Sequence, residues 1–216
     1  METSFFDSDY FIVGYYILTV GASLLLIKDT KKRIRNLKIG RNSIKYAPIS
    51  FGILVAYVLF VFPYVDEIPI LNWSWLGYNI AFGPFAEEGM WGILPFMPLL
   101  LYMFLHINYF EERFFRKSKK MVIVWALIHI AMGIKIHMAL VLIPIGFVFK
   151  YVYDKKGLQH SYAMHFATNI LIVCMLFFRL YFESFLGSTL RTCVIRRYAN
   201  SPPRNRLMTP RTVIIK

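Results

Sequence analysis

Two adjacent carboxylates, Glu111 and Glu112, stand in the segment EERFFR at the end of a long apolar run. Side chains four residues apart share one face of a helix, so Glu112 and Arg116 have the spacing of an ion pair. Glu111 lies about 100° away around such a helix, which leaves it free to act as a general base. The alternative is a solvated turn at the membrane surface with ordinary ion pairs.

Three further polar residues lie in otherwise apolar segments. His129 follows Trp125 by one helical turn, and it could either act in catalysis or form a hydrogen bond between helices. His165 and Asn169 are four residues apart, so one helical face offers an imidazole and an amide together. That pair could bind a water molecule, a metal or a developing oxyanion, or could simply bond two helices together.

Considered together, these groups favour a site. Ionisable side chains at membrane depth are costly, and they commonly mark function. The chain supplies a candidate base, additional hydrogen-bond donors and a candidate oxyanion stabiliser, which are the groups needed to activate water against an amide. We therefore expect a hydrolytic site inside a membrane protein.

Composition supports a membrane location. The 216 residues are 57% hydrophobic, above the roughly 45–50% of ordinary soluble domains, and the excess falls in long runs. The two cysteines, Cys174 and Cys193, cannot build a disulfide framework. We expect an integral, multi-pass protein of a prokaryotic plasma membrane.

The net charge of +13 is concentrated in two segments. Residues 28–45 hold eight Lys or Arg against one Asp, and residues 191–216 hold seven without an acid. Basic clusters beside membrane spans set topology and contact anionic lipid, and no nucleic-acid-reading fold is recognisable. We expect membrane lipid as a partner and no nucleic acid.

The apolar runs predict an all-α fold, a polytopic transmembrane bundle of about six membrane helices. It should occupy residues 1–187, with the candidate site in 108–172 and a basic, disordered tail in 188–216. Residues 72–88 read as an interfacial or broken helix. The expected spans are 10–27, 46–63, 89–110, 121–133, 136–152 and 161–185.

Loop charge places the basic loop 28–45 and the polar stretch 111–120 in the cytoplasm, with Asp66 and Glu67 outside. Simple alternation would then leave the basic tail outside. Either residues 72–88 also span, or the last helix is not a full crossing. The sequence leaves both open.

Three ordered motifs carry a resemblance to a known family. EERFFR matches EExxxR, WALIH matches an aromatic residue followed by xxx-His, and HFATN matches HxxxN. Together they resemble the CPBP family of membrane peptidases, which includes the CAAX proteases and the bacteriocin-processing Abi proteins. The resemblance covers about residues 108–172.

The resemblance implies an intramembrane endopeptidase acting on a peptide or protein delivered at the membrane. It assigns Glu111 to water activation, Glu112 and Arg116 to its support, and His129 to the second motif. His165 and Asn169 would stabilise the oxyanion. We favour a mechanism without a cofactor. The alternative is Zn2+ held by Glu111, His129 and His165.

Two other functions fit the same residues. The chain could be a non-enzymatic membrane immunity or scaffold protein that binds a peptide in the same cavity, or a transporter with a proton relay. A second acidic pair, Glu87 and Glu88, has Gly92 where EExxxR would place arginine, and we interpret it as interfacial.

Overall fold

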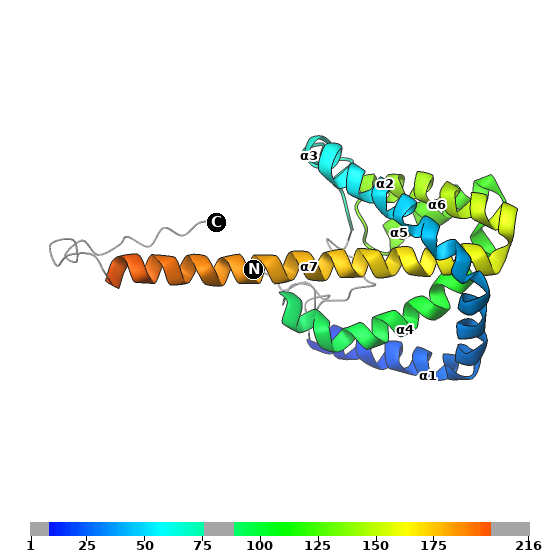
Figure 1. The fold of residues 1–216 in the computed structure, drawn as a ribbon, viewed down its shortest axis with the longest axis horizontal. Helices are drawn as coiled ribbons and strands as arrows, with labels where there is room; N and C mark the ends of the chain where they lie inside the picture. Colours follow the sequence, from blue (N-terminus) through cyan, green and yellow to red (C-terminus); the bar gives the residue numbers. More distant parts are fainter. Residues whose placement is uncertain (1–8, 76–88, 200–216) are drawn as a thin grey trace. The chain divides into compact units, whose positions relative to one another are not determined.

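The computed structural model describes residues 9–75 and 89–199, and within these ranges the regular elements are all helices (Figure 1). The all-α prediction is confirmed. The elements are α1 (Asp9–Gly40), the 3-10 helix η2 (Arg41–Tyr46), α2 (Ala47–Phe60), α3 (Phe62–Val65), α4 (Gly89–Phe115), α5 (Lys119–Ala131), α6 (Ile136–Lys156) and α7 (Leu158–Ala199).

Three helical stretches in the described ranges are long and apolar enough to cross a membrane: Val20–Phe60, Ile136–Lys156 and Leu158–Phe178. A membrane helix needs about 20 predominantly apolar residues, and each stretch meets that length. The chain therefore has the character of a membrane protein.

The basic segment 28–45 is helical, whereas we expected a loop there. α1 continues to Gly40, and η2 leads into α2 without a break. The reason is a buried stripe: Arg33, Asn36 and Gly40 are buried, while most of the neighbouring basic side chains are exposed. A stripe at this spacing stabilises a helix by packing it on its neighbours.

Helix α1 packs beside α4, and the two run in the same direction (Figure 1). The hydroxyl of Thr30 lies 3.5 Å from Nε2 of His106. Three residues later in both helices, the guanidinium of Arg33 lies 3.7 Å from the ring centre of Tyr109. The matched advance along the two helices means that α1 supports α4 over several turns.

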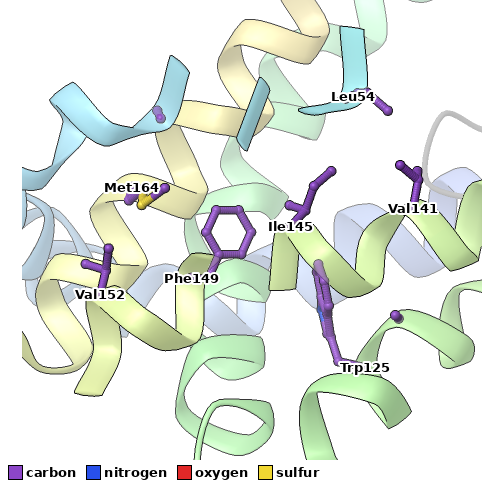
Figure 2. Packing of buried hydrophobic residues seen from close by; sticks show 9 residues of the cluster. Leu54, Trp125, Val141, Ile145, Phe149, Val152 and Met164 are labelled. Carbon is purple, nitrogen blue, oxygen red and sulfur yellow. The ribbon is translucent and has the colours of Figure 1, made fainter. Parts of the chain in front are cut away.

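The main hydrophobic core joins α2, α5, α6 and the start of α7 (Figure 2). Its packing depends on Gly146 in α6, where an added Cβ would lie 2.8 Å from Val122 Cγ1 and 3.0 Å from Trp125 Cε3. The missing side chain lets Val122 and Trp125 of α5 approach α6 closely. Figure 2 labels Leu54, Trp125, Val141, Ile145, Phe149, Val152 and Met164 of this core.

The segment before residue 76 caps the start of α6. The backbone N–H groups of Ile136 and His137 donate to the carbonyls of Trp73 and Leu71, at 3.2 and 3.0 Å. The first N–H groups of a helix have no partner within the helix. The carbonyls of Trp73 and Leu71 accept from two of these groups, so neither is buried without a hydrogen bond. The remainder of the expected segment 72–88, including Glu87 and Glu88, lies outside the described residues.

The chain divides into two compact units, Met1–Met175 and Leu176–Lys216. Within the second unit, α7 continues to Ala199, so residues 188–199 are helical where we expected a disordered tail. The segment ends just before Ser201-Pro202-Pro203, and proline lacks the N–H that a helix needs. Residues 200–216 lie outside the described ranges.

Candidate active site

Two helical faces meet at the candidate site. The end of α4 with the residue that follows it, and the first turns of α7, each supply three polar residues at intervals of four. Asn169 contacts Asn108, and His165 contacts Glu112, so the two helices pass in opposite directions. The residues are Asn108 and Glu112 on α4 with Arg116 directly after it, and Ser161, His165 and Asn169 on α7.

Glu112 is the centre of these contacts. Its side chain is completely buried, and Oε1 accepts from Nε of Arg116 at 2.9 Å and from Nδ1 of His165 at 2.8 Å. The hydroxyl of Ser161 contacts Oε2. Glu112 lies outside the three apolar stretches. Burial by itself would raise the pKa of its carboxyl. The guanidinium of Arg116, with His165 and Ser161, outweighs burial and holds that pKa below its usual value.

Arg116 is also completely buried, and the ion pair with Glu112 is the one that the spacing predicts. Its guanidinium carbon lies 4.0 Å from the ring centre of Trp125. Its two terminal nitrogens have no hydrogen-bond partner among the described residues. Charge pairing and the aromatic ring together compensate for placing a cation inside the bundle.

Glu111 approaches the other nitrogen of the same imidazole. Its Oε2 lies 3.5 Å from Nε2 of His165, and its side chain is 16% exposed. Because a carboxylate only accepts hydrogen bonds, Nδ1 of His165 carries the proton in the contact with Glu112. The imidazole is thus held by the buried carboxylate and directed to the more accessible one.

Aromatic rings fix the plane of His165. Phe149 stacks on the imidazole with ring centres 4.5 Å apart, and Trp125 meets it edge-on at 5.7 Å. His165 is 3% exposed, so its ring is held by packing as well as by hydrogen bonds. A preorganised imidazole needs no rearrangement when a substrate arrives.

His129 lies next to this group without joining its hydrogen bonds. Its Nδ1 donates to the carbonyl of Trp125 at 2.7 Å, and its ring meets the Trp125 ring at 4.9 Å. Within the described part of the chain, no hydrogen bond links His129 to Glu111 or His165. His129 and His165 therefore both contact the indole ring of Trp125.

Asn169 reaches the site through a residue that the sequence analysis did not select. Its Nδ2 donates to Oδ1 of Asn108 at 3.0 Å. Asn108 is 1% exposed, and its own Nδ2 is buried without a partner among the described residues. The spacing of four residues from Glu112 could have identified Asn108, because it places both side chains on one face.

Two other contributors were also missed. Ser161 precedes His165 by four residues, and its hydroxyl contacts both Glu112 and the carbonyl of Phe149. Its spacing was a usable signal. Phe149 comes from α6, and nothing in its local sequence separates it from the other apolar residues of that helix.

The described residues contain no group of three or more His, Cys, Asp or Glu side chains placed to hold one metal ion. In the alternative zinc set, Glu111 and His165 approach each other, but Nδ1 of His129 is used by a backbone carbonyl. These residues do not form a ligand set in this arrangement.

Together, the residues offer an accessible carboxylate beside an imidazole whose orientation is fixed by a buried ion pair. A carboxylate in that position can remove a proton from water, and the imidazole and amides can donate to developing negative charge. Comparison with protein-family models, with curated proteins and with solved structures gives no match. A function is therefore inferred from this geometry and from the motifs that it contains.

Proposed function

We propose that the chain is an intramembrane endopeptidase of the CPBP type, a multi-pass protein with about six membrane helices in a prokaryotic plasma membrane. The observation that carries this is the contact of His165 with both carboxylates, at 2.8 Å from Glu112 and 3.5 Å from Glu111. Motif residues more than fifty positions apart meet in one buried cluster. That convergence supports reading the motifs as one site.

In the proposed reaction, a water molecule lies between Glu111 and the carbonyl carbon of a peptide bond. Glu111 removes one proton as the water oxygen attacks that carbon. The tetrahedral intermediate collapses, the C–N bond breaks, and the proton held by Glu111 passes to the departing amine. The products are a carboxylic acid and an amine, and the glutamate is restored.

His165 and Asn169 are the proposed donors to the oxyanion, with His129 beside them. Because Nδ1 of His165 donates to Glu112, the donation from Nε2 requires that the ring carries a proton on both nitrogens. The Nδ2 amino group of Asn169 has two N–H bonds: one donates to Asn108, and the second would donate to the oxyanion. A single donor of this kind is worth about 100- to 1,000-fold in kcat. Glu112 and Arg116 act through His165 and are positioning residues in this scheme.

The test uses the full chain purified into proteoliposomes with a library of quenched fluorescent peptides. Glu111→Gln should abolish cleavage, because an amide cannot accept the proton from water. Glu67→Gln, which removes an exposed carboxylate, should leave cleavage unchanged. Cleavage should also persist in a zinc chelator such as 1,10-phenanthroline.

These measurements distinguish the glutamate mechanism from the zinc mechanism and from the immunity or scaffold function. Full activity in Glu111→Gln would remove Glu111 from its proposed role. Loss of activity in the chelator, with recovery on adding zinc, would favour the zinc mechanism. Wild-type protein that cleaves no peptide, but whose biological effect survives Glu111→Gln, would favour the immunity or scaffold function.

A further inference from the structure

One basic residue of α1 differs from all its neighbours. Of the eight Lys and Arg side chains in residues 28–45, seven are exposed, and Arg33 alone is buried, at 5% exposed. No carboxylate lies within ion-pair distance of Arg33 in the described ranges, although Asp29 lies one turn earlier. A buried cation without a counter-charge is costly and calls for a compensating partner.

The aromatic rings of α4 compensate for part of that cost. The guanidinium carbon of Arg33 lies 3.7 Å from the ring centre of Tyr109 and 5.3 Å from that of Phe110. Aromatic faces stabilise the plane of a guanidinium, but they do not satisfy its N–H groups. Nε of Arg33 remains buried without a hydrogen-bond partner in the described part of the chain.

A second unpaired nitrogen lies in the same interface between α1 and α4. His106 is completely buried, and its Nδ1 has no partner among the described residues. Its Nε2 lies 3.5 Å from the hydroxyl of Thr30, one turn before Arg33. The interface thus holds the Arg33 guanidinium with its unpaired Nε, and the unpaired Nδ1 of His106. Nitrogens of these two kinds, when they carry a proton, donate to oxyanions.

The surface next to this interface is apolar. Ile34, Phe110 and Phe114 are 43%, 39% and 51% exposed. Phe110 stacks on Phe114 at 6.5 Å, and Nζ of Lys117 lies 5.7 Å from the Phe114 ring centre. Cations beside exposed apolar rings suit a molecule that has both a negative group and a hydrocarbon part.

We propose that the interface between α1 and α4 binds the phosphate group of an anionic phospholipid at Arg33, with its acyl chains over Phe110 and Phe114. The apolar run of α1 ends at Ile27, so Arg33 lies where the chain leaves the hydrocarbon. The seven exposed basic side chains nearby favour anionic lipid over zwitterionic lipid. This site does not depend on the proposed peptidase activity.

The test measures the melting temperature of the full chain in detergent micelles. Dioleoyl phosphatidylglycerol should raise it by about 3 °C or more above the effect of dioleoyl phosphatidylcholine. Arg33→Gln should lose that increment. Arg35→Gln, which removes the same charge from an exposed position two residues away, should keep it.

Three results would overturn the proposal. Equal effects of the two lipids would remove the preference for anionic headgroups. Equal losses in Arg33→Gln and Arg35→Gln would indicate diffuse attraction to the basic segment. Equal stabilisation by inorganic phosphate, without lipid, would show that the site takes the free ion instead.

A second measurement covers the case in which Arg33→Gln does not fold. Wild-type protein is irradiated with phosphatidylglycerol that carries a diazirine in its headgroup, and labelled peptides are mapped by mass spectrometry. Labelling should concentrate in residues 30–36 and 102–117. Labelling spread evenly over the basic segments, or confined to other helices, would contradict the proposal.

Discussion

Nδ1 of His165 lies 2.8 Å from Oε1 of Glu112, and the same carboxylate oxygen lies 2.9 Å from Nε of Arg116. One oxygen of a buried glutamate therefore orients the imidazole and neutralises the arginine. Any change at Glu112 should affect both stability and the position of His165, which makes it the most informative position to vary.

Glu112→Gln should destabilise the protein by about 3–5 kcal/mol, because it leaves the Arg116 guanidinium buried without its counter-charge. The double change Glu112→Gln with Arg116→Gln removes both charges and should recover much of that loss. Cleavage should remain defective in both variants, because His165 loses the carboxylate that orients it.

The measurement is the free energy of unfolding in mixed SDS micelles, together with peptide cleavage. Recovery of stability without recovery of activity would separate the ion pair from the orienting role. If the double variant is as unstable as Glu112→Gln, the burial of the unpaired arginine is not the cause of the loss.

Asn108→Ala should lower kcat for peptide cleavage by about 10-fold or more, because Asn169 loses the acceptor that holds its amide in place. KM should change little, since the effect is on donation to the oxyanion. Asn36→Ala is the control: it truncates another buried amide, on α1, and no hydrogen bond links Asn36 to the catalytic cluster within the described residues.

Steady-state kinetics of the two variants would check this, with melting temperatures recorded in parallel. A similar loss of kcat in Asn108→Ala and Asn36→Ala would mean that general destabilisation is responsible. Unchanged kcat in Asn108→Ala would exclude Asn108 from positioning Asn169.

Gly40→Ala should destabilise the fold by about 1–3 kcal/mol, because a Cβ at this position would overlap the carbonyl oxygen of Gln159 at the start of α7. Gly52→Ala in α2 meets no atom within 4 Å, and alanine is the better helix former. It should be neutral or stabilising by up to about 1 kcal/mol.

Unfolding in SDS micelles compares the two glycine variants directly. The prediction requires that they differ in sign or by at least about 1 kcal/mol. Equal stability would mean that α1 and α7 can separate at Gly40 without cost, and that the close approach there is not needed to align α7 with α4.

The sequence alone determined the helical class and the membrane character. Long apolar runs without the alternation of strands can satisfy their backbone groups in lipid only as helices. It also determined the ion pair of Glu112 with Arg116, because this contact joins residues four apart at the end of α4 and depends on that local spacing.

The ends of the helices were harder to predict from the sequence. The basic segment 28–40 and residues 188–199 are helical, although their charge suggested a loop and a tail. Charge reports where a side chain can be solvated, and an exposed helical face satisfies that condition as well as a loop does. The burial of Arg33 distinguishes the two, and burial is a property of packing.

Only the tertiary structure decided which polar groups meet. It brought His165 to both carboxylates, placed Asn108 against Asn169, and left His129 bonded to the carbonyl of Trp125. These relationships depend on how α4 crosses α7 and how α5 packs on α6. Such crossings are set by the summed packing of many apolar side chains, which no local spacing encodes.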